Sequence, residues 1–203
     1  MLMGKEKLAD DLMQNAKVVH DATVKLSKLV DDLLSVSRIE RGKFEVVMAE
    51  HDLMELIQEC CQELEPNVKK KEITFEIEKT NEATTFYFDS ALVKQVHLNL
   101  LSNSIKYSNK GGVIKIAIRT LNGSNIQVGV TDSGIGISDH ERSHVFERFY
   151  RTKQAIESGE VGSGLGLAVA RMLIEKCGGK IWYESTLGKG STFFYSLPMK
   201  QKL

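Results

Sequence analysis

The spacing of apolar residues in the N-terminal part of the chain predicts one long helix. Between Lys5 and Glu40 there is no proline, and Gly4 and Gly42 lie just outside the two ends. Apolar and small residues recur there at alternating spacings of four and three, the period of a helical seam. The seam consists of Leu12, Ala16, Val19, Thr23, Leu26, Val30, Leu33 and Ser37. Because a lone helix cannot bury such a seam, we expect it to pack against other helices. The alternative is an amphipathic helix docked on its own domain.

From residue 44 onward the pattern changes to alternating strands and helices. A short strand is expected at 44–48, and Asp52 is expected to cap a helix, with Glu55 completing a capping box. This helix should run to about Lys70, with Pro66 near its end or kinking its last turn. Asp89 is expected to cap a helix through Tyr107. The other expected elements are strands at 73–77, 85–88, 113–121, 126–131, 180–185 and 192–197, a short helix after 138, an irregular segment at 152–161 and a helix at about 165–177.

These elements predict an α/β fold, a two-layer α/β sandwich with helices on one face of a mixed sheet. We expect two parts, a helical segment at 1–43 and a globular domain at 44–203. A chain of 203 residues with 42% hydrophobic residues is long enough to bury such a core.

Charge and cysteine content narrow the classes of function. The 27 basic and 27 acidic residues cancel, which gives no indication of a nucleic-acid partner. Cys60, Cys61 and Cys177 have neither CxxC spacing nor histidines arranged for zinc, so reduced thiols and a cytoplasmic location are expected. No apolar run is long enough to span a bilayer, and any membrane anchor of a parent protein would lie outside this chain.

Four short blocks carry the candidate chemistry. They are Asn99-Leu-Leu-Ser-Asn103-Ser-Ile-Lys106-Tyr107, Asp132-Ser-Gly134-Ile-Gly136-Ile, Val145-Phe146-Glu-Arg148-Phe149-Tyr150-Arg151 and Gly162-Ser-Gly164-Leu-Gly166-Leu. In this order and at these distances they resemble the N box, first glycine box, F box and second glycine box of sensor histidine kinases. The resemblance implies the Bergerat ATP-binding fold, with ATP and Mg²⁺ as cofactors. It also implies an ATP-dependent protein histidine kinase, whose phosphoryl group passes from a histidine to the receiver domain of a response regulator.

The first block suits a metal and a nucleotide. Asn99 and Asn103 are four residues apart, so they share one helix face, with Lys106 next along the same stripe. Mg²⁺ prefers a few protein oxygens together with substrate phosphates, which two amide oxygens would allow. Lys106 adds a positive charge for phosphate, and Tyr107 offers a ring to adenine. A lone asparagine on a helix is usually only solvated, so the interpretation depends on the whole block.

Asp132 closes a strand and begins the Gly134-Ile-Gly136 turn. An ionised carboxylate only accepts hydrogen bonds, which fits the exocyclic amine of adenine. The two glycines would let backbone approach the base. The alternative is an ordinary Asp-Ser-Gly turn.

Gly162, Gly164 and Gly166 open a helix, and exposed amides at a helix N-terminus bind phosphate. A Rossmann site would need a strand directly before them, whereas the preceding segment is polar, and no P-loop motif is present. The segment 152–161 resembles the ATP lid of the family. Phe146, Phe149 and Tyr150 either anchor its near end or belong to the core, and Arg148 and Arg151 are expected to be solvated without nucleotide.

Gly190-Ser-Thr192-Phe resembles the last box of the family, in which the threonine hydroxyl supports the adenine-binding Asp132. The alternative is a turn that feeds a strand. The resemblance implies that Asn99, Asn103 and Lys106 are catalytic and that Asn99 and Asn103 hold the metal. The implied nucleotide site comprises Asn99, Asn103, Lys106, Tyr107, Asp132, Gly134, Gly136, Ile137, Gly162, Gly164, Leu165, Gly166 and Thr192.

The end of the long helix, at 29–44, resembles the second helix of the family's dimerisation and histidine-phosphotransfer domain. That implies a homodimer formed through this helix. The first helix, with its H box, is absent from the sequence. His20-Asp21 lacks the proline that follows in an H box, so His20 is expected to be a flanking helix residue. We therefore expect no autophosphorylation by this chain alone, and a histidine-bearing helix as a partner.

Two other classes of protein remain as alternatives. Gyrase-like, mismatch-repair and chaperone ATPases share the fold, but they lack the F box with this short lid. A non-enzymatic module of the same fold would show damage at Asn99, Asn103, Asp132 or the glycines, and all of these are intact.

Overall fold

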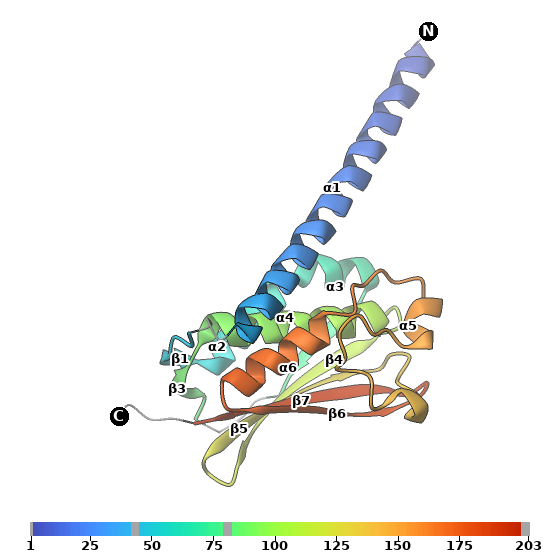
Figure 1. The fold of residues 1–203 in the computed structure, drawn as a ribbon. Coiled ribbons are helices and arrows are strands. Elements are labelled where there is room, and N and C mark those ends of the chain that lie inside the picture. Colours follow the sequence, from blue (N-terminus) through green and yellow to red (C-terminus); the bar gives the residue numbers. More distant parts are fainter. Residues whose placement is uncertain (1, 42–44, 79–82, 200–203) are drawn as a thin grey trace.

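The computed structural model describes residues 2–41, 45–78 and 83–199, and it shows an α/β fold in two layers (Figure 1). One layer is a five-stranded sheet. Its strands, in order across the sheet, are β2 (Thr74–Ile77), β4 (Val113–Leu121), β5 (Asn125–Asp132), β7 (Gly190–Pro198) and β6 (Lys180–Thr186). β2 runs parallel to β4, and the other neighbours are antiparallel. The mixed sheet that the sequence predicts is therefore confirmed.

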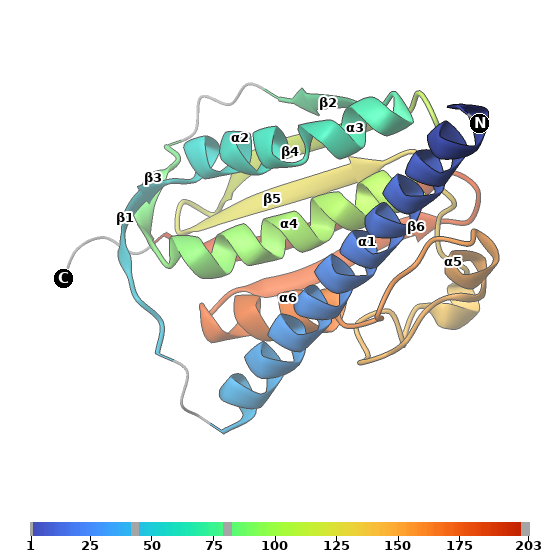
Figure 2. The same cartoon turned by 90° about the horizontal axis from the view of Figure 1, so that it is seen from above.

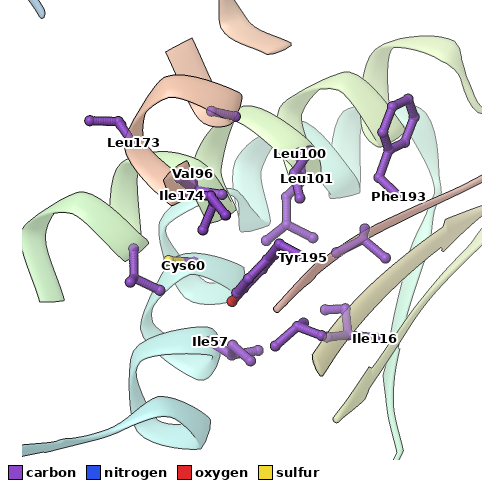
Figure 3. Packing of buried hydrophobic residues seen from close by; sticks show 14 of the residues in the cluster. Ile57, Cys60, Val96, Leu100, Leu101, Ile116, Leu173, Ile174, Phe193 and Tyr195 are labelled. Atoms are coloured by element: carbon purple, nitrogen blue, oxygen red, sulfur yellow. The ribbon is translucent and has the colours of Figure 1, made fainter. Parts of the chain in front are cut away.

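The second layer consists of helices on one face of this sheet, seen from above in Figure 2. They are α2 (Leu53–Glu63), α3 (Glu65–Lys71), α4 (Ser90–Tyr107) and α6 (Gly166–Lys176). Figure 3 shows Tyr195 of β7 and Ile116 of β4 among Ile57, Leu100 and Leu173 from three of the helices. Removing these apolar side chains from water is the main force that joins the two layers.

Two aspartates begin the helices as the sequence predicts. Asp52 Oδ1 accepts a hydrogen bond from Met54 N at 2.8 Å at the start of α2. Asp89 Oδ1 accepts from Leu92 N at 3.1 Å at the start of α4, and its Oδ2 accepts from Val47 N at 2.8 Å. The cap of α4 therefore also fastens the segment that leads into β1.

The prediction of a strand at 44–48 is wrong, because the strand lies further along the chain. Residues 45–48 are irregular, residue 44 lies outside the described part, and the strand is β1 (Ala49–Asp52). It pairs with β3 (Thr85–Phe88) in a separate two-stranded sheet, in which Ala49 lies opposite Phe88. The apolar run that suggested an earlier strand has no such partner, because Val47 N is bound to the Asp89 side chain instead.

The single helix expected from Asp52 to about Lys70 is divided in two. α2 ends at Glu63, Leu64 lies between the helices, and α3 begins at Glu65. Pro66 occupies the first turn of α3, where its missing N–H costs no helical hydrogen bond.

The segment 152–161 is also more regular than expected. It contains a short helix, α5 (Lys153–Glu157), whose first turn is capped by Thr152, because Oγ1 accepts from Ala155 N at 3.2 Å. A 3-10 turn, η1 (Asp139–Glu141), follows Ser138 as predicted. A carboxylate oxygen of Glu141 accepts from Lys153 N at 2.7 Å and so anchors the beginning of α5.

The long helix α1 (Leu2–Glu40) extends away from the domain and touches it only near its C-terminal end (Figure 1). There it contacts α6, and Val36 and Ile39 are buried. Along the free part, Leu12, Val19 and Leu26 of the seam are 61%, 65% and 63% exposed. Packing of the seam against other helices stays a prediction. No helix in the described part of the chain has the length and apolarity needed to cross a membrane.

Candidate functional site

A cavity of about 290 Å³ lies beside α4 and α6 and collects most of the predicted site residues. Its predicted lining residues are Asn99, Asn103, Lys106, Tyr107, Asp132, Gly136, Ile137, Gly162, Gly164 and Gly166. They come from three blocks that are far apart in sequence. The fold therefore brings the amide, carboxylate and glycine groups to one place.

Asn99 connects the first block to the last. It lies on α4, is only 3% exposed, and its Nδ2 donates to Gly166 O at 3.2 Å. Because that bond uses the amide nitrogen, the amide oxygen is the atom that can serve a cation. Asn103 lines the cavity one turn further along α4.

Asp132 lies at the end of β5 and is 7% exposed. Its Oδ1 accepts from Gly134 N at 2.9 Å and from Ser191 N at 3.3 Å. Burial raises the pKa of Asp132 from 3.8 to about 6, although the two backbone N–H groups favour the charged form. At neutral pH the carboxylate is mostly ionised and accepts hydrogen bonds.

Gly134 has a different role from the one expected. It does not line the cavity. The turn that contains it lies on the end of α4, where Ile135 N donates to Tyr107 O at 3.2 Å. A Cβ on Gly134 would collide with this same carbonyl and would lie 2.8 Å from Asp132 Oδ1. The glycine therefore allows β5 to approach α4 closely, rather than allowing backbone to approach a base.

The backbone at Gly164, just before α6, packs closely against residues of the third block. Gly164 has φ +71°, and a Cβ there would lie 2.6 Å from the backbone carbon of Phe149. Phe149 N donates to Gly164 O at 3.0 Å, which fastens the two blocks together. Leu165, predicted as a cofactor contact, is instead fully buried and does not line the cavity.

The interpretation of Thr192 as the support of Asp132 is wrong. Thr192 Oγ1 lies 3.0 Å from Thr131 Oγ1, away from the cavity. The preceding residue, Ser191, lines the cavity and donates its backbone N–H to Asp132. Strand alternation explains the error, because adjacent residues of β7 face opposite sides of the sheet.

The third block directly precedes the segment 152–161, which we call the lid, and its aromatic residues lie in different environments. Phe146 packs against Tyr183 and Phe193 with ring centroids 5.9 and 6.5 Å apart, whereas Phe149 is 63% exposed. Tyr150 lines the cavity, and its hydroxyl donates to a Glu141 carboxylate oxygen at 3.3 Å.

Neither arginine of this block is simply solvated, contrary to expectation. Arg148 forms an ion pair with Glu40 at the end of α1, with Nη1 2.6 Å from Oε1. Arg151 lines the cavity, and its Nη2 donates to Ala155 O at 2.7 Å and Glu160 O at 2.5 Å. Its buried Nε has no hydrogen-bond partner among the described residues.

Leu29 and Asp32 of α1 also line the cavity, and neither was predicted. Asp32 is only 3% exposed. The sequence periodicity places both residues on a helix, but it does not show where that helix docks. The docking of α1 against the domain brings them to the cavity.

Comparison with known proteins gives a consistent result. Residues 88–201 match the family model of histidine kinase-, DNA gyrase B-, and HSP90-like ATPases. The adaptive-response sensory kinase SasA of Microcystis aeruginosa is 31% identical over 174 residues, which make up 86% of this chain and 45% of that protein. The chain thus spans less than half the length of this relative.

Solved structures share the fold. Full-length ShkA in complex with AMPPNP superposes with a TM-score of 0.75 at 25% identity, over 87% of this chain and 36% of that one. The histidine kinase ThkA in complex with the response regulator protein TrrA gives a TM-score of 0.68 at 30% identity, over 88% of this chain and 49% of that one.

Proposed function

This chain belongs to the family of histidine kinase-, DNA gyrase B-, and HSP90-like ATPases, as the catalytic domain of a sensor histidine kinase, and we propose that it positions Mg-ATP for phosphoryl transfer to a histidine supplied in trans. The observation that carries this proposal is the convergence of Asn99, Asp132 and the Gly162–Gly166 run on one cavity. Each group supplies a different part of nucleotide recognition.

The adenine end of the cavity is assigned to Asp132. Its carboxylate would accept a hydrogen bond from the exocyclic amine, a donor that guanine lacks at that position. Tyr107 lines the same cavity and offers its ring to the base. Ser191, which holds Asp132 through its backbone N–H, is part of this end of the site.

The phosphate end is assigned to Lys106 and the N-terminus of α6. Gly162, Gly164 and Gly166 line the cavity there, and amides at a helix N-terminus attract anions. Phosphoryl transfer needs little covalent chemistry from the protein, so the contribution of these groups is positioning and electrostatic stabilisation.

The residues present fit Mg²⁺. Asn99 and Asn103 present neutral amide oxygens from one helix face, and the hydrogen bond from Asn99 to Gly166 fixes the first of them. This donor set suits a cation that also binds phosphate oxygens and water. When bound, Mg²⁺ would neutralise charge on the phosphates.

The phosphoryl acceptor is proposed to be a histidine on a partner helix, and the next recipient a response regulator receiver domain. ThkA, which shares this fold, was solved in complex with a response regulator. A homodimer through α1 is proposed because the apolar seam of that helix is exposed. A cytoplasmic location is proposed because it supplies ATP and keeps the free Cys60, Cys61 and Cys177 reduced.

A two-step experiment tests the function. Calorimetric titration of ATP and GTP, with and without Mg²⁺, should show adenine-specific binding that Mg²⁺ strengthens. Addition of a separate histidine-bearing helix hairpin should then give acid-labile phosphate on that hairpin. Asn103→Ala should reduce Mg²⁺-dependent transfer more than metal-free ADP binding. Tight binding without any transfer would favour a non-enzymatic module, and equal ATP and GTP affinity would contradict the assigned site.

A further inference from the structure

Lys71 lies outside the cavity and contacts two segments that border it, the C-terminal end of α4 and the lid. Lys71 is the last residue of α3, and its Nζ donates to Ile105 O at 3.0 Å and also to Lys106 O. The same Nζ lies 3.2 Å from Glu160 Oε1 in the lid. Figure 1 shows the segment between α5 and α6 at the same end of the molecule as the C-terminal end of α3.

The end of α4 explains why an ammonium group lies there. The last carbonyl groups of a helix have no partner within the helix and carry partial negative charge. An ammonium group has three donors, and here they go to two of these carbonyls and to the Glu160 carboxylate. The Lys71 and Glu160 side chains are 27% and 37% exposed, so water screens this pair less than it screens a surface pair.

Glu160 is held from a second direction. Arg151 Nη2 donates to Glu160 O at 2.5 Å and to Ala155 O at 2.7 Å, which ties the end of the lid to α5. Val161 and Gly162, which directly follow Glu160, line the cavity. The position of Glu160 therefore determines where the glycine run enters the site.

We propose that Lys71 is a positioning residue that latches the lid to the end of α4 through Glu160. The proposal rests on the function proposed above, because the latch would retain the nucleotide that α4 and the glycine run bind. Breaking it frees the end of the lid without removing any group that lines the cavity. Dissociation of nucleotide should then become faster.

The lid supplies a matched control. Glu157 is also a lid carboxylate, but it pairs within α5, with its Oε1 3.8 Å from Lys153 Nζ and its side chain 63% exposed. Glu160→Ala and Glu157→Ala remove the same charge from the same segment. Only the first removes a contact between the lid and α4.

Two measurements test the latch. In the nucleotide-free protein, amide hydrogen exchange at 158–162 should be faster in Glu160→Ala than in wild type or Glu157→Ala. In stopped-flow displacement of a fluorescent ADP analogue, Glu160→Ala should dissociate about fivefold faster, in keeping with a partly screened ion pair. Its melting temperature should match that of Glu157→Ala, which separates positioning from loss of fold.

A Lys71→Met background completes the test. In this background Glu160→Ala should not accelerate nucleotide dissociation further. Lys70→Met changes an exposed neighbour instead, and in that background Glu160→Ala should accelerate dissociation as much as it does in wild type. Unchanged exchange and dissociation in Glu160→Ala would overturn the latch, and so would slower dissociation. If wild type bound no adenine nucleotide, the proposed function would fail, and the amide exchange comparison would still decide the contact.

Discussion

Asp132 shows how one side chain can be prepared for a ligand at a cost to the free protein. Burial disfavours its charge and raises its pKa to about 6, while Gly134 N and Ser191 N partly stabilise the carboxylate. An exocyclic amine of adenine would add a further donor to the charged form. Nucleotide binding should therefore favour ionisation and depend on pH.

Adenine nucleotide affinity should fall on acidification because the accepting form of Asp132 disappears below pH 6. At pH 5 a group with this pKa is about one-tenth ionised, so affinity should be about tenfold lower than at pH 7. Asp132→Asn should weaken the binding free energy of ADP by about 1.5–3 kcal/mol at pH 7, and its ADP affinity should depend less on pH. Calorimetry with ADP on both proteins measures this, since phosphate titration is common to the two. Parallel pH profiles would refute the assignment.

His97 gives a second pH-dependent property, which concerns stability. It is fully buried on α4, its Nδ1 lies 3.2 Å from the Tyr195 hydroxyl, and burial lowers its pKa from 6.5 to about 3. Since the unfolded state binds this proton more tightly, stability is full above pH 6.5 and is lost as pH falls toward 3. The loss should reach about 2 kcal/mol between pH 6.5 and 5.

Denaturant unfolding of wild type and His97→Gln across this range measures the effect. Asp132 acts in the opposite sense, because its raised pKa makes the folded state gain a proton, and hence stability, between about pH 6 and 4. Both proteins share that contribution, so their difference isolates His97. An equally steep loss of stability in His97→Gln would show that His97 is not responsible.

At the scale of single residues, local sequence predicted which side chains line the cavity where these residues belong to one block. Asn99 and Asn103 follow from helical spacing, and Asp132 follows from a strand end before a glycine turn. Ser191 was missed because the alternation of β7 decides which of two adjacent hydroxyl residues faces the cavity. Arg151 was wrongly expected to be solvated, because its partners are carbonyl groups of a lid whose helix the sequence did not predict.

At the scale of elements, α4 organises the molecule, and its N-terminal cap is a separate test of stability. Asp89 is 6% exposed and accepts hydrogen bonds from Leu92 N and Val47 N. Asp89→Ala should lower the free energy of unfolding by about 1–2 kcal/mol, because the helix loses its cap. Asp139→Ala removes an 81% exposed carboxylate that pairs with Arg142, so it should change stability by less than about 0.5 kcal/mol. Equal effects in urea unfolding would contradict this role of Asp89.

The elements themselves were predictable where local signals agree. The sequence alone was enough to predict the helix caps at Asp52 and Asp89. It was also enough to predict the two strands on either side of Asn122-Gly123. β1 was misplaced because strand pairing is not local, and the register with β3 decides which residues extend. Pro66 lies in the first turn of α3, just after the point where the expected helix divides. A proline is compatible with either a kinked helix or the start of a new one, so the sequence alone did not decide between them.

At the scale of the whole molecule, α1 has two parts along its length that lie in different environments. Its end is docked on the domain, and its free part exposes an apolar stripe. Such a stripe should drive self-association. Sedimentation should therefore show a concentration-dependent dimer or larger species, and Leu26→Glu should shift it toward monomer. Lys17→Gln, beside the seam, should leave the association unchanged, and a wild-type monomer at all concentrations would contradict the prediction.

The same geometry predicts that this chain alone incorporates no acid-labile phosphate from ATP. His20 is exposed on the free part of α1, whereas Leu29 is where that helix meets the cavity wall. At 1.5 Å per residue the two positions are about 13.5 Å apart along the helix axis, so in this arrangement His20 lies away from the cavity in which ATP is proposed to bind. Radiolabelled ATP should therefore label wild type and His20→Ala equally weakly, and strong labelling should require an added histidine-bearing hairpin. Robust labelling of the chain alone, abolished in His20→Ala, would make His20 the phosphoryl acceptor.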